Sequence, residues 1–291
     1  MRSPLNMLTK FVFPLLLIYF AYHSLGPVAG LVLFIIFLGL TVYSGRCWIF
    51  AARANKKYTQ GDFNGALGDL AAAVAADPKS AAVRGNYAYL LLKLGHTEKA
   101  GAQIDIALKT AEHPRDKASM TVTKALVLWK QNRVDEAAAM LSDLLKTYET
   151  TDVYATLGFL YIAKGDQDEA LEFNLKAKEY NGNNAIILDN LGTSYLLLED
   201  YEKALEIYKE VMKLKPLFPE AYYNYGRALE KTGDLEKALH MVRHSLSLRF
   251  WNISTVERET VEAYLRQLEE MEKANRPENM PEELPETQPD D

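Results

Sequence analysis

The chain has 291 residues, of which 48% are hydrophobic and 25% are charged, and its formal net charge is −6. This composition excludes wholesale disorder. The mixed signs along the body leave no basic stripe for a phosphate backbone, so no nucleic-acid partner is expected. The single cysteine, Cys47, excludes an intrachain disulfide framework and a zinc site made of cysteines. We interpret Cys47 as a small buried residue, with lipidation beside the apolar segment as the alternative.

An apolar segment without any charged residue covers residues 11–45. One helix across these 35 residues would be about 50 Å long, well beyond a hydrocarbon core of about 30 Å. The sequence Ser24-Leu25-Gly26-Pro27 interrupts the segment and favours a turn. We therefore expect residues 1–45 to be a membrane anchor, a transmembrane hairpin of two helices over about 8–24 and 28–44.

Basic residues flank this anchor at both ends and are missing from its loop. Arg2 and Lys10 precede the first span, and Arg46 and Lys57 follow the second. The positive-inside rule then puts both termini and the body of an integral membrane protein in the cytoplasm. The alternative is a cleaved signal peptide with its apolar region at 11–22, although no small-x-small cleavage pattern precedes the second span.

The body repeats one pattern at intervals near 34 residues. Tyr154, Leu157, Gly158 and Tyr161 are followed by Leu188, Leu191, Gly192 and Tyr195. A small alanine marks each copy, at Ala66, Ala100, Ala137, Ala170, Ala204 and Ala238. Such a period indicates an array of stacked units. The pattern resembles the tetratricopeptide repeat (TPR), a helix-turn-helix unit. The resemblance implies an all-α fold, a right-handed superhelical solenoid of about six units in which the alanines and glycines let paired helices approach closely.

This resemblance divides the rest of the chain. The solenoid is expected over residues 46–252, with units at about 47–80, 81–114, 118–150, 151–184, 185–218 and 219–252. The capping-box sequence Ser254-Thr255-Val256-Glu257 then predicts a C-terminal capping helix over 253–273. Acidic residues and regularly spaced prolines predict a disordered tail over 274–291.

By the same resemblance, the first helix of each unit lines a concave groove that binds proteins or peptides. The residues expected to point into this groove are Asn55, Tyr58, Tyr89, Lys93, Trp129, Phe159, Asp189, Thr193, Tyr223 and Arg227. Its rings suit a peptide ligand, because aromatic side chains give contact area at little cost in entropy. Alternatively, Trp129 and Phe159 only pack between units. A clamp for a C-terminal carboxylate is not expected, because Ala51, Ser119 and Thr123 stand where the family's clamp has basic residues.

No constellation of catalytic residues is visible in the sequence. His240 and His244 have the spacing of metal ligands on one helix, but no third ligand is indicated, and a solvated convex face is the interpretation. We therefore expect no catalytic residue, no metal and no cofactor, and a protein that is not an enzyme. An enzyme would need a polar pocket that excludes water.

The sequence thus predicts a membrane-anchored TPR scaffold or adaptor, which binds partner proteins or peptides at the cytoplasmic face of a membrane. The alternative is a structural assembly subunit of a membrane protein complex that contacts its partners mainly through the hairpin. Gly30 and Gly39 offer small surfaces for such helix packing.

Overall fold

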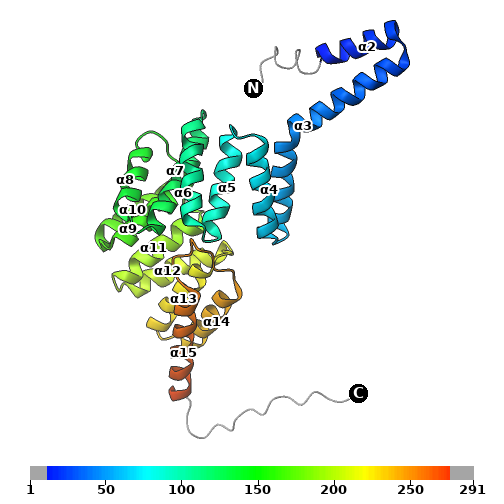
Figure 1. The fold of residues 1–291 in the computed structure, drawn as a ribbon. Helices are drawn as coiled ribbons and strands as arrows, with labels where there is room; N and C mark the ends of the chain where they lie inside the picture. The colour runs from blue at the N-terminus through cyan, green and yellow to red at the C-terminus, as the bar shows by residue number, and fades with distance from the viewer. Residues whose placement is uncertain (1–11, 276–291) are drawn as a thin grey trace, which may run out of the picture. The chain divides into compact units, whose positions relative to one another are not determined.

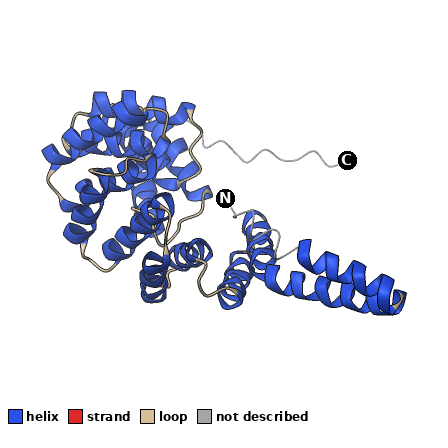
Figure 2. Ribbon diagram, turned by 90° about the horizontal axis from the view of Figure 1, so that it is seen from above, coloured by secondary structure: helices blue, strands red, loops and turns tan. Residues whose placement is uncertain are grey.

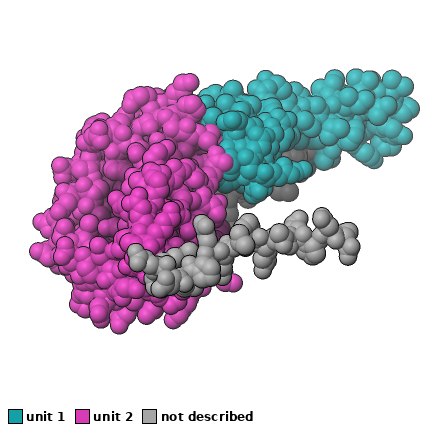
Figure 3. Space-filling view, turned by 90° about the horizontal axis from the view of Figure 1, so that it is seen from below, with its two compact units in different colours: residues 1–87 teal, residues 88–291 magenta. Residues whose placement is uncertain are grey.

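The computed structural model of this protein describes residues 12–275, and the regular secondary structure in that range is helical throughout (Figures 1 and 2). The helices are α2 (Phe13–Leu25), α3 (Pro27–Thr59), α4 (Phe63–Ala76), α5 (Ala81–Lys93), α6 (Thr97–Thr110), α7 (Pro114–Lys130), α8 (Val134–Leu145), α9 (Thr151–Lys164), α10 (Gln167–Asn181), α11 (Ala185–Leu197), α12 (Tyr201–Lys213), α13 (Pro219–Lys231), α14 (Leu235–Ser247) and α15 (Arg258–Asn275). The chain divides into two compact units, residues 1–87 and 88–291 (Figure 3).

The first unit begins with a helical hairpin. The chain turns at Gly26, and Pro27 opens α3, where its missing N–H costs nothing. A Cβ atom on Gly30 would lie 2.7 Å from the Cβ atom of Tyr22, so the glycine is what lets α2 and α3 pack closely. The turn expected at Gly26 and Pro27 is therefore present.

The expected pair of membrane-crossing helices is not supported by the described residues. Among them, α3 is the helix long and apolar enough to cross a membrane. The 13 residues of α2 give a length of only about 20 Å. Residues 8–11 of the first expected span lie outside the described range. The second span was expected to stop at residue 44, but α3 runs unbroken to Thr59 and packs against α4 as the first helix of the repeat array.

A recurrent turn separates the two helices of a repeat. Asp62, Asp166, Asp200 and Asp234 are the N-caps of second helices, and each carboxylate accepts a hydrogen bond from the backbone N–H three residues later. The preceding residue adopts a left-handed conformation, as at Gly165 (φ 92°) and Gly233 (φ 89°). A Gly-Asp pair therefore ends one helix and begins the next in three of these turns, and Glu199-Asp200 does so in the fourth, where Glu199 adopts the left-handed conformation (φ 61°).

The second unit has two layers of helices. The first helices contact one another in sequence, α7 with α9, α9 with α11 and α11 with α13. The second helices α8, α10 and α12 pack against the first helices on both sides, α6 packs against α7, and α14 packs against α13 and α15. Small residues set this close spacing. A Cβ atom on Gly192 would lie 2.7 Å from the Tyr208 ring, and one on Gly226 would lie 2.5 Å from Val242. The marker alanines are fully buried. The close approach expected at these positions is confirmed.

The hydrophobic core is shared between repeats. Leu128 of α7 and Leu141 of α8 form one cluster with Leu157 and Leu160 of α9, and each of these side chains is fully buried. A single repeat therefore has no complete core of its own. At the end of the array, α15 buries Val261 and Leu268 against Leu239 and Val242.

The last helix begins later than the capping-box sequence suggests. The helix was expected from residue 253, but α15 begins at Arg258. The Ser254 hydroxyl accepts a hydrogen bond from the Trp251 N–H at 3.2 Å, so it stabilises a turn before the helix. The helix also runs on to Asn275, so residues 274 and 275 of the tail expected over 274–291 are helical, and the rest of that tail lies outside the described residues.

Candidate functional site

The candidate site is the layer of first helices in the second unit. The side chains of Trp129 on α7 and Phe159 on α9 meet there edge to face, with ring centroids 4.6 Å apart and an interplanar angle of 80°. Both rings are half-buried and pack against the core cluster between their repeats. They therefore do pack between units, as the alternative interpretation held, and part of each ring stays accessible.

A buried polar network joins α11, α12 and α13. Asn224 donates from Nδ2 to Asp189 Oδ1 at 3.4 Å and to Thr193 Oγ1 at 3.2 Å. The Tyr208 hydroxyl donates to the Asp189 carbonyl oxygen at 3.2 Å and lies 3.0 Å from Thr193 Oγ1. Arg227 donates to Asn224 Oδ1 at 3.4 Å. Asp189 and Thr193, both expected in the groove, thus lie in one network with Arg227.

The sequence predicted that Asp189 points into the groove, but its carboxyl is buried. Only 6% of the residue is exposed. Burial, with the nearby carboxylate of Glu220, raises the pKa of Asp189 to about 7. Burial also raises the pKa of Glu220. Near neutral pH the Asp189 carboxyl is therefore only partly ionised, so its charge depends on pH.

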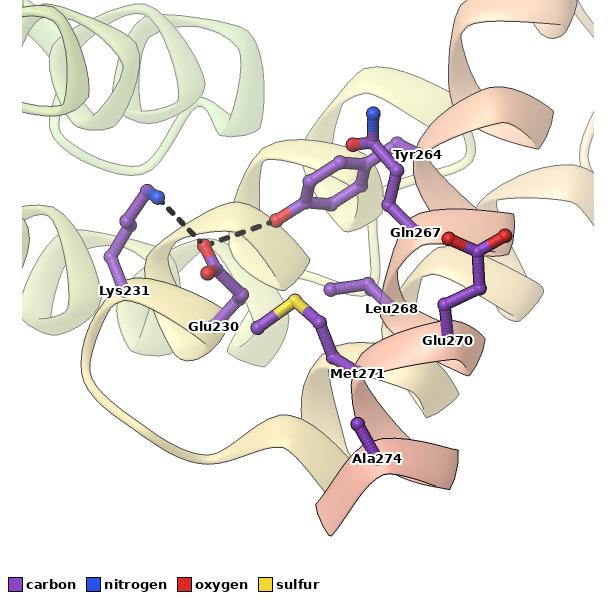
Figure 4. A pocket seen from close by; sticks show the side chains of 8 residues that line it. All are labelled: Glu230, Lys231, Tyr264, Gln267, Leu268, Glu270, Met271 and Ala274. Atoms are coloured by element: carbon purple, nitrogen blue, oxygen red, sulfur yellow. Dashed lines mark hydrogen bonds and ion pairs between the residues drawn. The ribbon is translucent and has the colours of Figure 1, made fainter.

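Tyrosine rings continue the layer toward its C-terminal end. The guanidinium of Arg227 lies 5.7 Å from the centroid of the Tyr223 ring, which meets the Tyr264 ring at 5.5 Å. The Tyr264 hydroxyl donates to Glu230. Beside it lies a recess of about 530 Å³ between the end of α13 and α15 (Figure 4). Tyr223 and Arg227 are thus neighbours, as their positions in the repeat predict.

Lys93 has a partner that the sequence did not suggest. Its Nζ atom lies 3.8 Å from the ring centroid of Trp251 and 5.7 Å from that of Tyr89, which is 39% exposed. Trp251 lies in the connection between α14 and α15. No repeat position predicts this contact, because the connection falls outside the periodic pattern.

Asn55 and Tyr58 lie on α3 in the first unit. Asn55 is exposed, and the Tyr58 ring meets the Phe63 ring edge to face at 5.2 Å. On the neighbouring turns of α3, Arg53 and Lys57 both form ion pairs with the buried Asp69 of α4. The hydrogen bond from Arg53, with that from Lys57, holds the pKa of Asp69 well below its usual range.

Metal chemistry has no support between residues 12 and 275, where no three His, Cys, Asp or Glu side chains come together as a metal site. His240 and His244 are exposed on α14, and the His244 ring lies 4.3 Å from the Tyr222 ring.

Comparison with known proteins agrees with this geometry. Two sequence models described as "Tetratricopeptide repeat" match the chain, one over residues 57–120 and 195–246 and the other over 122–184. The chain belongs to the tetratricopeptide repeat family. Proteins of this family typically act as scaffolds for protein–protein interaction, and the fold is typically non-catalytic.

Curated relatives match this TPR chain only over part of their length. It is 32% identical over 105 residues to the BBSome complex member BBS4 of Bos taurus. That match covers 36% of this chain and 20% of the relative. It is 26% identical over 165 residues to the TPR repeat-containing protein MJ1428 of Methanocaldococcus jannaschii. That match covers 55% of this chain and 29% of the relative.

Solved structures share the fold of this TPR chain. A tetratricopeptide repeat protein from Parabacteroides merdae superposes with a TM-score of 0.63 at 14% identity, over 90% of this chain and 99% of that chain. PilW, a type IV pilus biogenesis factor, superposes with a TM-score of 0.57 at 17% identity, over 75% of this chain and 98% of that chain. At these identities the likeness is one of fold.

Proposed function

We propose that this protein is a membrane-anchored TPR scaffold, which binds partner proteins or peptides through its layer of first helices at the cytoplasmic face of a membrane. The observation that carries the proposal is the continuity of α3. One helix is apolar and exposed over its first half and is part of the repeat array over its second half. A membrane that anchors the first half of α3 therefore also tethers the repeat array, because both are parts of one continuous helix.

The exposed side chains of the hairpin support a lipid environment. Large apolar residues of α3 stand exposed around the helix, among them Leu31, Val32, Phe34, Ile35, Ile36, Leu38, Leu40 and Val42. A soluble surface rarely carries so much contiguous apolar area. The stretch from Pro27 to Tyr43 is about 26 Å long, close to the thickness of a hydrocarbon core. We propose that α3 crosses the bilayer and that α2 packs against it within the membrane.

The residues that follow suit a membrane–water interface. The guanidinium of Arg46 lies 3.8 Å from the centroid of the Tyr43 ring, and Trp48 is 61% exposed. Aromatic and basic residues are enriched at this depth. Basic residues continue at Arg53 and Lys57, which supports a cytoplasmic repeat body by the positive-inside rule.

The layer of first helices is the proposed binding surface. It offers partly exposed rings at Tyr89, Trp129 and Phe159, and the same layer contains the polar network of Asp189 and Asn224. The chain carries 39 acidic and 33 basic residues with the signs interspersed along its body and no basic stripe, so we expect protein rather than nucleic-acid partners. The relative BBS4 is described as a member of the BBSome complex, which agrees with a role in binding proteins.

Crosslinking and mass spectrometry in native membranes test this function. The full chain should resist alkaline carbonate extraction, and partner crosslinks should include Lys130, which stands on α7 next to Trp129. Crosslinks confined to the convex second helices would contradict the proposed binding surface. Complete extraction of the protein by carbonate would contradict the anchor.

A second candidate is an assembly subunit that binds through the hairpin. Gly30 already packs against Tyr22 inside the hairpin, so it cannot contact another protein. A Cβ atom on Gly39 or Gly45 of α3 would meet nothing within 4 Å. Small residues without neighbours let another helix approach closely in a membrane. If Gly39→Leu removes the crosslinked partners and Tyr89→Ala does not, the second candidate replaces the first.

A further inference from the structure

The connection between α14 and α15 folds back onto the end of α5. Asn252 donates from its backbone N–H to the Lys93 carbonyl at 3.1 Å, and from Nδ2 to the Leu92 carbonyl at 2.9 Å. These partners are 160 residues apart in the sequence. A helix ends with carbonyl groups that lack intrahelical donors, and Asn252 supplies such donors from outside.

The ring of Trp251 strengthens this contact. The Nζ atom of Lys93 lies 3.8 Å from the ring centroid, and the Arg249 guanidinium lies 4.3 Å from it. Both distances are within the range of a cation–π interaction. A turn presents the ring, because the Trp251 N–H donates to Ser254 Oγ and the Ser254 N–H donates to the Trp251 carbonyl.

Hydrogen bonds also join this connection to the last repeat. The Thr255 N–H donates to Glu220 Oε1 at 2.8 Å. Arg258 donates to the carbonyls of Leu246 and Leu248, and its guanidinium lies 4.8 Å from the Phe250 ring. Residues 249–255, which we call the latch, therefore bridge the last repeat to α5 (Figure 1).

The latch closes a circuit of packed elements. A tight turn joins α5 to α6, α6 packs against α7, and contacts continue from helix to helix as far as α15. The latch returns from α14 to α5. The contacts of the second unit therefore return to α5, and the latch is held by side-chain and backbone contacts rather than by a packed helix pair.

The contacts of the latch are of a kind that opens easily. Trp251 and Asn252 are only half-buried, whereas Phe250 remains packed with the last repeat and α15. Two hydrogen bonds from Asn252 and a cation–π pair between Lys93 and Trp251 are among the contacts that hold the closed form, and each is individually weak. Trp251 and Asn252 belong to none of the core clusters described above, so their release would not break the packing of those clusters.

We propose that the latch is a built-in ligand. Its Trp251 and Asn252 occupy a peptide-docking site formed by the Lys93 side chain and the carbonyls at the end of α5. A partner segment of the same chemistry, an aromatic residue followed by a carboxamide, takes this site when the latch is released. This inference goes beyond the proposed function, because it concerns the end of α5 rather than the rings of Trp129 and Phe159, and it does not depend on the membrane.

A peptide that copies the latch tests the site. The probe is a fluorescein-labelled peptide of residues 248–257, LRFWNISTVE, and its control is LRFAAISTVE. The proteins are the full chain in detergent, the same chain with Trp251→Ala and Asn252→Ala, and that double variant with Lys93→Ala added. Asn183→Ala serves as the control variant, because Asn183 is exposed and far from the latch in sequence. Fluorescence anisotropy gives the affinities, and circular dichroism checks the helix content.

The double variant is expected to bind the latch peptide at least tenfold more tightly than the wild type or Asn183→Ala. The control peptide should not bind, and adding Lys93→Ala should abolish binding. If the double variant loses helix, the single Asn252→Ala chain replaces it in the same comparison. Equal binding of the two peptides, or equal binding by the wild type and the released variant, would overturn the proposal and leave the connection a fixed strut.

Discussion

Asn224 on α13 donates a hydrogen bond to the buried carboxyl of Asp189 on α11, which ties together the first helices of two consecutive repeats. The bond lies in the same layer as the candidate binding rings. Because the Asp189 carboxyl is buried, its charge state affects the stability of that layer.

Stability should fall with rising pH because of Asp189. Its pKa is about 7 in the folded chain, against about 3.9 in an unfolded one. Between these values the unfolded carboxyl has released its proton and the folded one has not. The folded state thus loses stability as pH rises from about 4 to 7, by up to about 4 kcal/mol. Thermal unfolding of the full chain in detergent across this range measures the effect.

The variant Asp189→Asn isolates this contribution. An amide keeps the size of the side chain and the oxygen that accepts from Asn224, and it does not ionise. The variant should match the wild type near pH 4 and be more stable than it at pH 8. A wild type and variant with parallel pH profiles would show that Asp189 does not carry the effect.

Close helix packing makes two glycines sensitive to one added carbon. In Gly192→Ala the new Cβ atom meets the Tyr208 ring, and in Gly226→Ala it meets Val242. Both atoms belong to fully buried side chains, so each variant should lose about 1–3 kcal/mol of stability. Gly68→Ala on α4 is the matched control, since its Cβ atom would meet nothing within 4 Å. That variant should gain about 0.5–1 kcal/mol from helix propensity. Unfolding curves that rank the three variants otherwise would contradict the packing account.

The sequence predicts the repeats well because their signals are local. Ala204 and Gly192 must be small wherever two helices of one repeat cross closely, so the pattern recurs whenever the geometry does. The Gly-Asp turns at 165–166 and 233–234 follow from the same logic. Fold class, helix pairing and the hairpin turn at Gly26 could all be read from such short-range constraints.

The contacts of the candidate site could not be read in the same way. The position of Asp189 in its repeat predicts a groove residue, but its burial depends on Asn224, which the next repeat supplies. The contact between Asn252 and Leu92 spans 160 residues and depends on the curvature accumulated over the array. Such curvature is a sum of small packing angles, and no single residue encodes it.

The aromatic rings in the layer of first helices should differ in how much they contribute to partner binding and to stability. Tyr89 is 39% exposed, so Tyr89→Ala should weaken partner crosslinking and leave the unfolding temperature nearly unchanged. Trp129 packs on Phe159 and against the core cluster, so Trp129→Ala should also cost about 1–3 kcal/mol of stability. Crosslinking yield in native membranes and thermal unfolding separate the two effects. A Tyr89→Ala chain that retains every partner crosslink would argue against this surface.

Charges placed on α3 should release the protein from membranes. Ile35 and Leu38 are exposed and lie near the middle of the apolar half of α3. An arginine at the centre of a membrane helix costs about 2.5–3.5 kcal/mol, so Ile35→Arg with Leu38→Arg should cost about 5–7 kcal/mol of insertion energy. The double variant should then become extractable by alkaline carbonate. Ile106→Arg with Leu175→Arg is the matched control, because both residues are 41% exposed on the repeat body. The control should stay in the membrane pellet. If the two double variants are extracted by carbonate to the same extent, the apolar half of α3 is covered by something other than lipid. The hairpin would then be the surface that binds a protein partner.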